Sequence, residues 1–458
     1  MAEKMKELVK IITRETIKPC SPTPSDLKSY RISFLDKLQP PVYINMVYFY
    51  PTNNHGTVTT TQQLKKSLSE SLARFYPISG RIISNNTSTI ECSDEGAEYV
   101  EAQFSGVDLS TFLGQPPADP AVLQQFFPAA CDSAGAGTWP LLVVQATFFE
   151  CGGFALGVCI SHKLADATTM NIFMKSWAAT SARSFGSAPK SIVDPVLDSA
   201  SYFPARDDLF RFQVSAPKLK KAEVVQRRYV FDKPKLMDLK AKITGGGDGV
   251  QLPTRVEAVV ALIAKSMMAA SSRPDSSSRG GGGGVDIPPK KFVVFQAVNL
   301  RARAEPPFPE NLVGNFVGFV NAESEEEVAV QHLVAEMRRG MRDFTEKKAE
   351  RLRGDSAGEV IVEGLKEVGD LIGRDNTCGL FFTSWCNSNI YEEVDFGWGK
   401  PIWATTPVIS DRLNCVTLMD TRDGGVEAWV SLSKEEMDSF ERDPQLLAYA
   451  SRNPSLLL

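Results

Sequence analysis

The chain has 458 residues, of which 43% are hydrophobic and 23% are charged, and its formal net charge is -5. A chain of this length can bury about two or three separate cores, and this composition is typical of globular proteins. The negative net charge disfavours nucleic acids and anionic membranes as partners, because both need a basic protein surface. No apolar run reaches the roughly 18 residues that a membrane-spanning helix needs.

The first residues and the cysteines both predict a cytosolic protein. The opening sequence MAEKMKELVKIITRETIKP places charged side chains where a secretory signal needs an unbroken apolar core. The eight cysteines show neither a CxxC pair nor metal-ligand spacing, so we expect reduced thiols and no zinc site. They stand at positions 20, 92, 131, 151, 159, 378, 386 and 415.

The first half of the chain predicts strands and helices in alternation. Residues 42–50 (VYINMVYFY) are aromatic and β-branched, as in a buried strand, and residues 59–77 place apolar side chains along one helical face. Residues 141–150 and 154–162 predict a hairpin of two core strands around a Cys-Gly-Gly turn. From Asp166 the apolar spacing becomes helical, with Asp166 as a candidate cap.

A stretch rich in Ser, Ala and Pro follows, from residue 184 to about 222, and lacks a sustained period. We interpret it as the connection between two domains. The expected division is an N-terminal domain over residues 1–205, a crossover over 206–222 and a C-terminal domain over 223–458.

The second half starts near RRYVFDK (227–233) and contains a helix at 252–270, which has Thr254 as its cap. Residues 271–285 are rich in glycine and predict a mobile surface loop. The remaining pattern predicts strands, acidic helices as far as about residue 371, and a hairpin whose turn is Asp423-Gly424-Gly425. The expected strands are 291–300, 315–322 and 381–385. The whole alternation indicates mixed α/β layers in both halves.

Only three histidines occur, and one of them differs from the other two in its surroundings. His55 lies in a polar turn and His332 on a charged helix, as surface residues do, whereas His162 ends a strongly apolar strand. Taken by itself, a histidine in that place is more often a satisfied core residue than a catalyst.

Two motifs make a catalytic role for His162 more probable. Residues 161–166 (SHKLAD) contain an HxxxD pattern, which is short enough to occur by chance in many chains. Residues 395–401 read DFGWGKP, a far less probable string. In isolation its aromatics and paired glycines could mark only a tightly packed loop.

HxxxD in mid-chain, followed by DFGWGKP near the C-terminus, resembles the BAHD acyltransferases, the plant acyl-CoA-dependent family. IKPCSPTP, TSWC and MDTRDGGVEAWV are most similar to the vinorine synthase-like members. The resemblance covers essentially the whole chain, because further segments match family landmarks in family order: YPISGR (76–81), LPTRVEA (252–258), VNLRAR (298–303), LVGN (312–315) and TSW (383–385).

The resemblance implies an α/β fold of two similar mixed-sheet domains, like chloramphenicol acetyltransferase, with a solvent channel between them. Coenzyme A is expected to enter from one face and the acceptor from the other, with His162 near the middle. One departure is Ala167 after Asp166, where many members carry Gly, which bears only on how the turn is built. Another is the glycine-rich insertion at 271–285, which we interpret as a surface insertion without a role in activity.

The chemistry of the residues agrees with this picture. A hydroxyl is a poor nucleophile until a base removes its proton, and imidazole, with an ordinary pKa of about 6.5, does so at neutral pH. His162 is therefore the candidate general base. A thiol has a pKa of about 8.5, so it leaves with little help, and no serine or cysteine nucleophile is needed.

The tetrahedral oxyanion still needs hydrogen-bond donors. The resemblance suggests Thr383 and Trp385 for this role, and two residues apart on one strand face the same side. An ordinary strand threonine and a packed indole are an equally good interpretation of the same residues.

Asp166 has three possible roles: it could orient His162 as in a triad, cap the following helix, or pair with a basic residue away from the reacting atoms. The resemblance favours the last role. We expect Arg301, in VNLRAR, to be the partner.

Coenzyme A carries phosphates that need cations or backbone N–H groups, and the helix that opens at Thr254 and Arg255 offers both. An ordinary capped helix is the alternative interpretation. Asn299 is a further candidate, near the pantetheine arm. The resemblance places the DFGWG loop away from the reacting atoms, so we expect structural roles for Asp395, Gly397 and Gly399.

The predicted function is acyl-CoA-dependent O-acylation, with an acetyl donor and an alkaloid or terpenoid alcohol favoured by the vinorine synthase-like segments. N-acylation of an amine by the same fold and a non-catalytic relative that binds a metabolite are the alternatives. Acyl-CoA would be a co-substrate, and we expect neither a permanently bound cofactor nor a metal. The expected state is a monomer in the cytosol.

Overall fold

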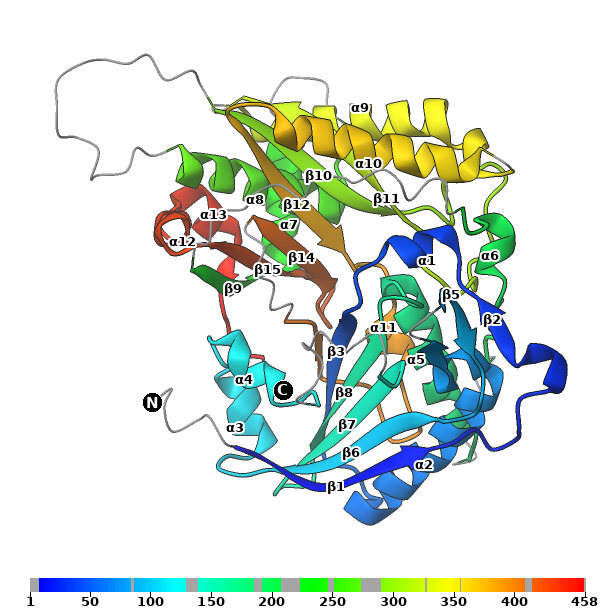
Figure 1. The fold of residues 1–458 in the computed structure, drawn as a ribbon. Coiled ribbons are helices and arrows are strands. Elements are labelled where there is room, and N and C mark those ends of the chain that lie inside the picture. The colour runs from blue at the N-terminus through cyan, green and yellow to red at the C-terminus, as the bar shows by residue number, and fades with distance from the viewer. Residues whose placement is uncertain are drawn as a thin grey trace.

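Two large β-sheets, one built mainly from each half of the chain, form the framework of the computed structural model (Figure 1). The structure describes residues 8–83, 86–128, 139–184, 192–206, 223–245, 251–272, 290–325, 328–354, 356–407 and 414–456. Nearly all of the expected crossover at 206–222 and of the glycine-rich stretch at 271–285 lies outside these residues.

The first sheet has the strand order β1-β6-β7-β8-β3-β13. Its strands are antiparallel except for the parallel pair β6 and β7. Their bounds are β1 Val9–Ile17, β6 Ala97–Phe104, β7 Leu142–Phe149, β8 Phe154–Ser161, β3 Tyr43–Tyr50 and β13 Trp403–Thr405. The predicted strand at 42–50 and the hairpin of β7 and β8 are confirmed.

Helices cover both faces of this sheet. On one face lie α2 (Gly56–Arg74) and α5 (Ala167–Ser184), which share an apolar core with alternate residues of β3, β7 and β8. On the other face α3 (Leu109–Gly114) and α4 (Pro120–Gln124) pack in a second core, which Trp429 of the other sheet also enters. A small sheet of β2 (Ser29–Arg31), β5 (Asn86–Glu91) and β4 (Arg81–Ile83) adjoins.

The second sheet has the order β11-β10-β12-β14-β15-β9-β16, with β10, β12 and β14 parallel to one another. Their bounds are β11 Val317–Ser324, β10 Lys291–Asn299, β12 Thr377–Ser384, β14 Cys415–Asp420, β15 Val426–Ser433, β9 Val224–Phe231 and β16 Ser451–Arg452. The predicted hairpin around Asp423-Gly424-Gly425 is confirmed as β14 and β15.

One face of the second sheet carries most of its helices in a single core. These helices are α7 Lys233–Thr244, α8 Arg255–Ser271, α9 Val330–Lys348, α12 Lys434–Phe440 and α13 Pro444–Tyr449. Helix α10 (Ala357–Gly373) packs on the opposite face, where its Leu371 meets Val293 and Phe295. The remaining described α-helices are short: α1 Phe34–Leu38, α6 Ser199–Tyr202 and α11 Ile390–Glu393.

The structure differs from the sequence prediction in two places that bear on the site. Strand β13 was not predicted, and it takes a strand from the second half of the chain into the sheet of the first half. Strand β12 ends at Ser384, so Trp385 directly follows the strand, and its backbone N–H still bonds to Leu418 of β14.

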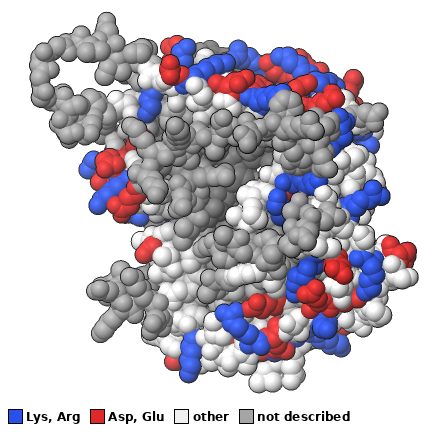
Figure 2. Space-filling model, viewed as in Figure 1, with Lys and Arg blue, Asp and Glu red and all other residues white. Residues whose placement is uncertain are grey.

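The charged side chains are intermixed on the face drawn in Figure 2, where Lys and Arg alternate with Asp and Glu along α9 and α10. Lys348 of α9 pairs with Glu367 of α10, and Arg351, just after α9, pairs with Glu363 of α10. None of the described helices is long and apolar enough to cross a membrane.

Candidate active site

His162 follows directly on β8, whose eight residues are all buried. Its backbone N–H donates to the carbonyl oxygen of Val42 (2.8 Å), which ties it to the chain just before β3. Its ring Nδ1 lies 2.9 Å from the carbonyl oxygen of Ala165. Because a carbonyl oxygen only accepts, Nδ1 carries the proton, and Nε2 of the neutral ring keeps its lone pair.

Burial lowers the pKa of His162 below its ordinary value of 6.5, although the bond to Ala165 favours the charged ring. The ring is therefore neutral at physiological pH. A neutral imidazole with one fixed tautomer can accept a proton at Nε2, which is what a general base has to do.

Asp166 forms the expected ion pair with Arg301. Arg301 Nη1 donates to Asp166 Oδ2 (2.7 Å) and Nη2 to Oδ1 (3.2 Å), and both residues are buried. Burial alone would raise the pKa of Asp166, but the charge of Arg301 lowers it below the ordinary value. The carboxylate also accepts from the backbone N–H of Thr169 (2.8 Å), so it caps α5 as well.

Asp166 consequently combines two of the three roles that the sequence left open, the helix cap and the ion pair. The third role, orientation of the His162 ring, falls to the carbonyl oxygen of Ala165 instead.

The segment around Asn315, which belongs to the LVGN motif, joins the two halves at this point. Asn315 Nδ2 donates to the backbone carbonyl of His162 (2.7 Å) and to Asp36 Oδ1 (2.8 Å). The next residue, Phe316, donates its backbone N–H to Asp166 Oδ2 (3.0 Å). The second half therefore binds the loop of His162 at two points, the backbone carbonyl of His162 and the carboxylate of Asp166.

Asp36 is a buried carboxylate that sequence reasoning missed. It receives hydrogen bonds from Asn315, from the hydroxyl of Ser199 (3.1 Å) and from the backbone and hydroxyl of Ser33. Burial raises its pKa above the ordinary value. The signal in the sequence is Ser33 three residues before Asp36, which forms a capping box at α1.

Asn299 lies at the end of β10 and contacts the same network. Its Oδ1 accepts from the backbone of Arg301 (3.0 Å), and its Nδ2 donates to the hydroxyl of Thr168 (3.2 Å) on α5. The structure therefore brings together His162, Asp166, Asn299 and Arg301.

Thr254 and Arg255 belong to a different group of contacts, at the start of α8. Thr254 caps this helix and forms a capping box with Glu257. The guanidinium of Arg255 donates to Asp420 (2.9 Å), to Asn387 (3.0 Å) and to the carbonyl of Gly424 (2.9 Å). Since its side chain is 32% exposed, part of the cation still faces solvent.

Arg255 is thereby tied to the segment that carries the oxyanion candidates, because Asn387 stands two residues after Trp385. Thr383 lies on β12 opposite Thr417 of β14. Trp385 donates its backbone N–H to Leu418 (2.8 Å) and packs, half-buried, against the core of the first sheet. No hydrogen bond among the described residues connects either side chain with His162 directly.

The DFGWG loop packs against the first half of the molecule. Asp395 Oδ1 accepts from the backbone N–H groups of Gly397 (2.9 Å) and Gly399 (3.0 Å), both of which have a positive φ (103° and 117°). The rings of Phe396 and Trp398 stack with centroids 5.4 Å apart. The left-handed backbone explains why glycine stands at both positions.

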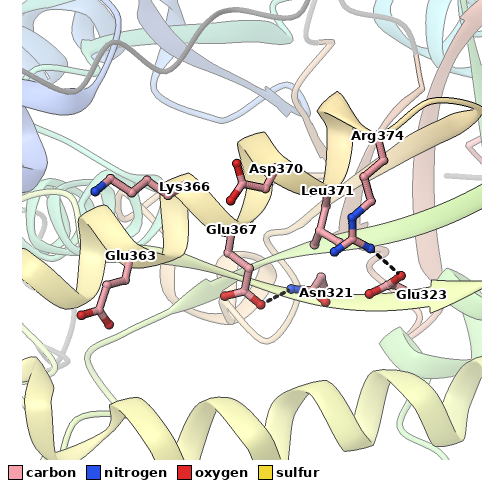
Figure 3. A pocket seen from close by; sticks show the side chains of 8 residues that line it. All are labelled: Asn321, Glu323, Glu363, Lys366, Glu367, Asp370, Leu371 and Arg374. Carbon is pink, nitrogen blue, oxygen red and sulfur yellow. Dashed lines mark hydrogen bonds and ion pairs between the residues drawn. The ribbon is translucent and has the colours of Figure 1, made fainter.

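A groove between β11 and α10 does not take part in this arrangement (Figure 3). Several of its side chains bind one another: Arg374 pairs with Glu323 (3.1 Å), and Asn321 donates to Glu367 (3.0 Å). None of its lining residues is one of the predicted site residues. Within the described part of the chain, no group of His, Cys, Asp and Glu is arranged to hold a metal ion.

Comparison with known proteins extends these observations. The chain matches the Transferase family over residues 7–447. It is 35% identical to a limonoid 21-O-acetyltransferase from Melia azedarach over 453 residues, which cover 98% of this chain and 100% of the relative. It is 33% identical to stemmadenine O-acetyltransferase from Catharanthus roseus over 445 residues, which cover 95% and 96% of the two chains.

Solved structures agree. The crystal structure of vinorine synthase aligns with a TM-score of 0.78 at 33% identity and covers 98% of this chain and 100% of the other. The complex of TRI101 from F. graminearum with coenzyme A and T-2 mycotoxin aligns with a TM-score of 0.69 at 16% identity, covering 93% and 99%, and shows the same fold. The chain therefore belongs to the Transferase family, the BAHD acyltransferases, and is an acyltransferase.

Proposed function

We propose that this acyltransferase is acyl-CoA-dependent, that it acylates a hydroxyl group, and that His162 is its general base. The observation that carries the proposal is the hydrogen bond from His162 Nδ1 to the carbonyl oxygen of Ala165 (2.9 Å). It fixes the tautomer in which Nε2 is free to accept a proton. The lowered pKa of the ring keeps that nitrogen unprotonated at neutral pH.

In this mechanism the acceptor hydroxyl gives its proton to His162 Nε2 while its oxygen bonds to the thioester carbonyl carbon. The negative charge that develops on the former carbonyl oxygen is stabilised by the hydroxyl of Thr383 and the indole N–H of Trp385. The carbon–sulfur bond then breaks, and the thiolate of coenzyme A takes the proton from His162. The chain forms no covalent intermediate, and neither a metal nor a resident cofactor is used.

Coenzyme A is a substrate in this scheme. We propose that its phosphates bind near the start of α8, where Thr254 caps the helix and Arg255 is held beside Asn387. Asn299, at the end of β10, is the proposed contact for the pantetheine arm. Arg255 would then bind the phosphate end of the molecule and Asn299 the pantetheine arm, at whose far end the thioester lies.

The relatives indicate the acceptor class. A limonoid 21-O-acetyltransferase and stemmadenine O-acetyltransferase each resemble this chain over at least 95% of its length. We propose acetyl-CoA as the donor and an alkaloid or terpenoid alcohol as the acceptor. The division at 206–222, the solvent channel, the monomeric state and the cytosolic location stay predictions from the sequence.

The test is turnover of labelled acetyl-CoA by the purified chain with a panel of limonoid alcohols, indole alkaloid alcohols and matched amines. Ester formation that requires both acetyl-CoA and an alcohol is the expected result. Amide products alone would replace O-acylation by N-acylation. Binding of coenzyme A without turnover of any acceptor would overturn the proposal in favour of a non-catalytic relative.

A further inference from the structure

A second buried ion pair, apart from Asp166 and Arg301, lies in the second sheet where it meets the first. Glu427 and Arg228 are 1% and 2% exposed, and Arg228 Nε donates to Glu427 Oε2 (2.7 Å). The same carboxylate accepts from the indole N–H groups of Trp403 and Trp429 (3.0 Å each) and from the hydroxyl of Thr405. We call these five residues the Glu427 cluster.

The Glu427 cluster links one sheet to the other. Trp403 and Thr405 stand on β13, the edge strand of the first sheet, whereas Arg228, Glu427 and Trp429 stand on β9 and β15 of the second. The guanidinium of Arg228 also lies over the ring of Trp403, 5.0 Å from its centroid. One carboxylate thus holds four donors from three strands.

A row of side chains leads from the Glu427 cluster to the proposed oxyanion site. Arg228 of β9 stands opposite Trp429 of β15, Trp429 opposite Thr417 of β14, and Thr417 opposite Thr383 of β12. Residues directly opposite on neighbouring strands share one face of a sheet and contact each other. This register makes Thr417 the link through which a shift of Trp429 would reach Thr383.

In the first sheet, paired strands connect the Glu427 cluster with His162, the proposed base. Trp403 of β13 stands opposite Phe49 of β3, and Tyr43 of β3 stands opposite Ser161, the last residue of β8. The N–H of His162 then binds the carbonyl of Val42. The Glu427 cluster therefore contacts β3 near Phe49, at the end of the strand opposite to His162, and it contacts the row of opposite residues that ends at Thr383.

We propose that Glu427 is a positioning residue for acyl transfer, which fixes the distance between the base and the group that stabilises the oxyanion. This role rests on the proposed function, because it needs Thr383 at the reacting carbonyl. A displacement of about 1 Å at reacting atoms can cost on the order of a hundredfold in rate. A carboxylate suits the place because its two oxygens accept from four donors at once.

The substitution Glu427→Gln tests the proposal, because it keeps the shape and replaces one acceptor oxygen by a donor NH2 group. Glu441→Gln is the matched control: Glu441 accepts from Arg227 Nε (2.9 Å), the neighbour of Arg228 on β9, but its contacts stay within the second half. Both variants are assayed at a temperature where circular dichroism shows them fully folded.

We expect Glu427→Gln to lower kcat about tenfold or more and to change KM for acetyl-CoA less than about twofold. Glu441→Gln should stay within about twofold of the parent in both constants. Equal kcat values for the two variants would overturn the proposal. If Glu427→Gln does not fold, Trp403→Phe removes one donor and keeps a smaller aromatic ring in its place, and it should lower kcat in the same way to a smaller extent.

Amide hydrogen exchange separates this proposal from the proposed function, since it needs no turnover. In Glu427→Gln, amides of residues 161–166 and 383–385 should exchange faster together with those of β13, while amides of α9 stay unchanged. Faster exchange confined to β9, β13 and β15 would overturn the positioning role, even in an active enzyme. A parent chain without acyl transfer would overturn the proposed function and with it the role in catalysis, whereas the exchange pattern still decides whether Glu427 couples the two segments.

Discussion

Asp166 and Arg301 form a bidentate ion pair that is buried between the two halves of the chain. Removing one partner of such a pair leaves an uncompensated charge and costs about 3 to 5 kcal/mol. We expect Asp166→Ala and Arg301→Ala each to lower the free energy of unfolding by this amount, and Asp166→Asn to lower it less. A double-mutant cycle from denaturant unfolding should give strongly non-additive losses. Additive losses would contradict a direct coupling.

Replacing His162 by Ala should abolish most turnover and leave the fold intact. Loss of a general base costs about two to four orders of magnitude in rate. His332, which is exposed on α9, provides the control, and His332→Ala should keep the rate of the parent. The measurement is kcat with acetyl-CoA and the best acceptor of the panel. Rates of His162→Ala within a few-fold of the parent would remove His162 from the mechanism.

The pH profile should show an acid limb that belongs to His162. The neutral ring is the base, so kcat/KM has its full value above the pKa of His162. It falls as pH drops through this pKa. Because burial lowers this pKa, the midpoint should lie below 6.5. The unfolded chain binds the proton at the ordinary pKa, so the stability that His162 contributes is also lost as pH falls below about 6.5. A midpoint at or above 6.5 would contradict the buried, neutral ring.

Asn315→Ala should impair catalysis through the backbone of His162. The change removes the donor to the carbonyl of His162 and one donor to the buried carboxylate of Asp36. A buried acceptor that loses its partner costs about 1 to 3 kcal/mol. We expect a stability loss of that size together with a fall in kcat, while KM for acetyl-CoA changes little. Asn321→Ala, at the surface groove, is the control and should leave kcat unchanged.

Arg255→Gln should raise KM for acetyl-CoA several-fold and leave kcat nearly unchanged, because phosphate binding is shared by ground state and transition state. Added salt should reduce the difference in KM between the variant and the parent, since screening weakens exposed charge pairs. Arg374→Gln provides the control, as this arginine also pairs with a carboxylate, Glu323, but lies at the surface groove. Unchanged KM in Arg255→Gln would exclude the cation from coenzyme A binding.

The sequence predicts much of the fold because its strands and helices carry strong periodic signals. The hairpin that ends at His162 and the helix capped by Thr254 are both present where the pattern predicts them. The pairing of Asp166 with Arg301 was also expected, but from the family resemblance and not from spacing. Local patterns describe neighbours along the chain, and these two residues are 135 positions apart.

Apart from the pair of Asp166 and Arg301, the sequence did not predict the contacts between residues that are far apart in the chain. Nothing in the spacing of Asp36 or Asn315 shows that they meet beside the backbone of His162. Likewise, Arg255 follows a predicted helix cap, yet its bonds to Asp420 and Asn387 depend on how β12 and β14 pair. Such contacts are set by tertiary packing, which one sequence leaves open.

The position of β13 has a consequence for how the protein is made. On the ribosome, β3 is complete after residue 50, but the strand that covers its outer edge emerges only with residues 403–405. Until then the sequence YINMVYFY has an open, aromatic edge, which is the kind of segment that aggregates. A fragment that ends before β13 should therefore precipitate, and supplying the missing strand as part of the second half should rescue it.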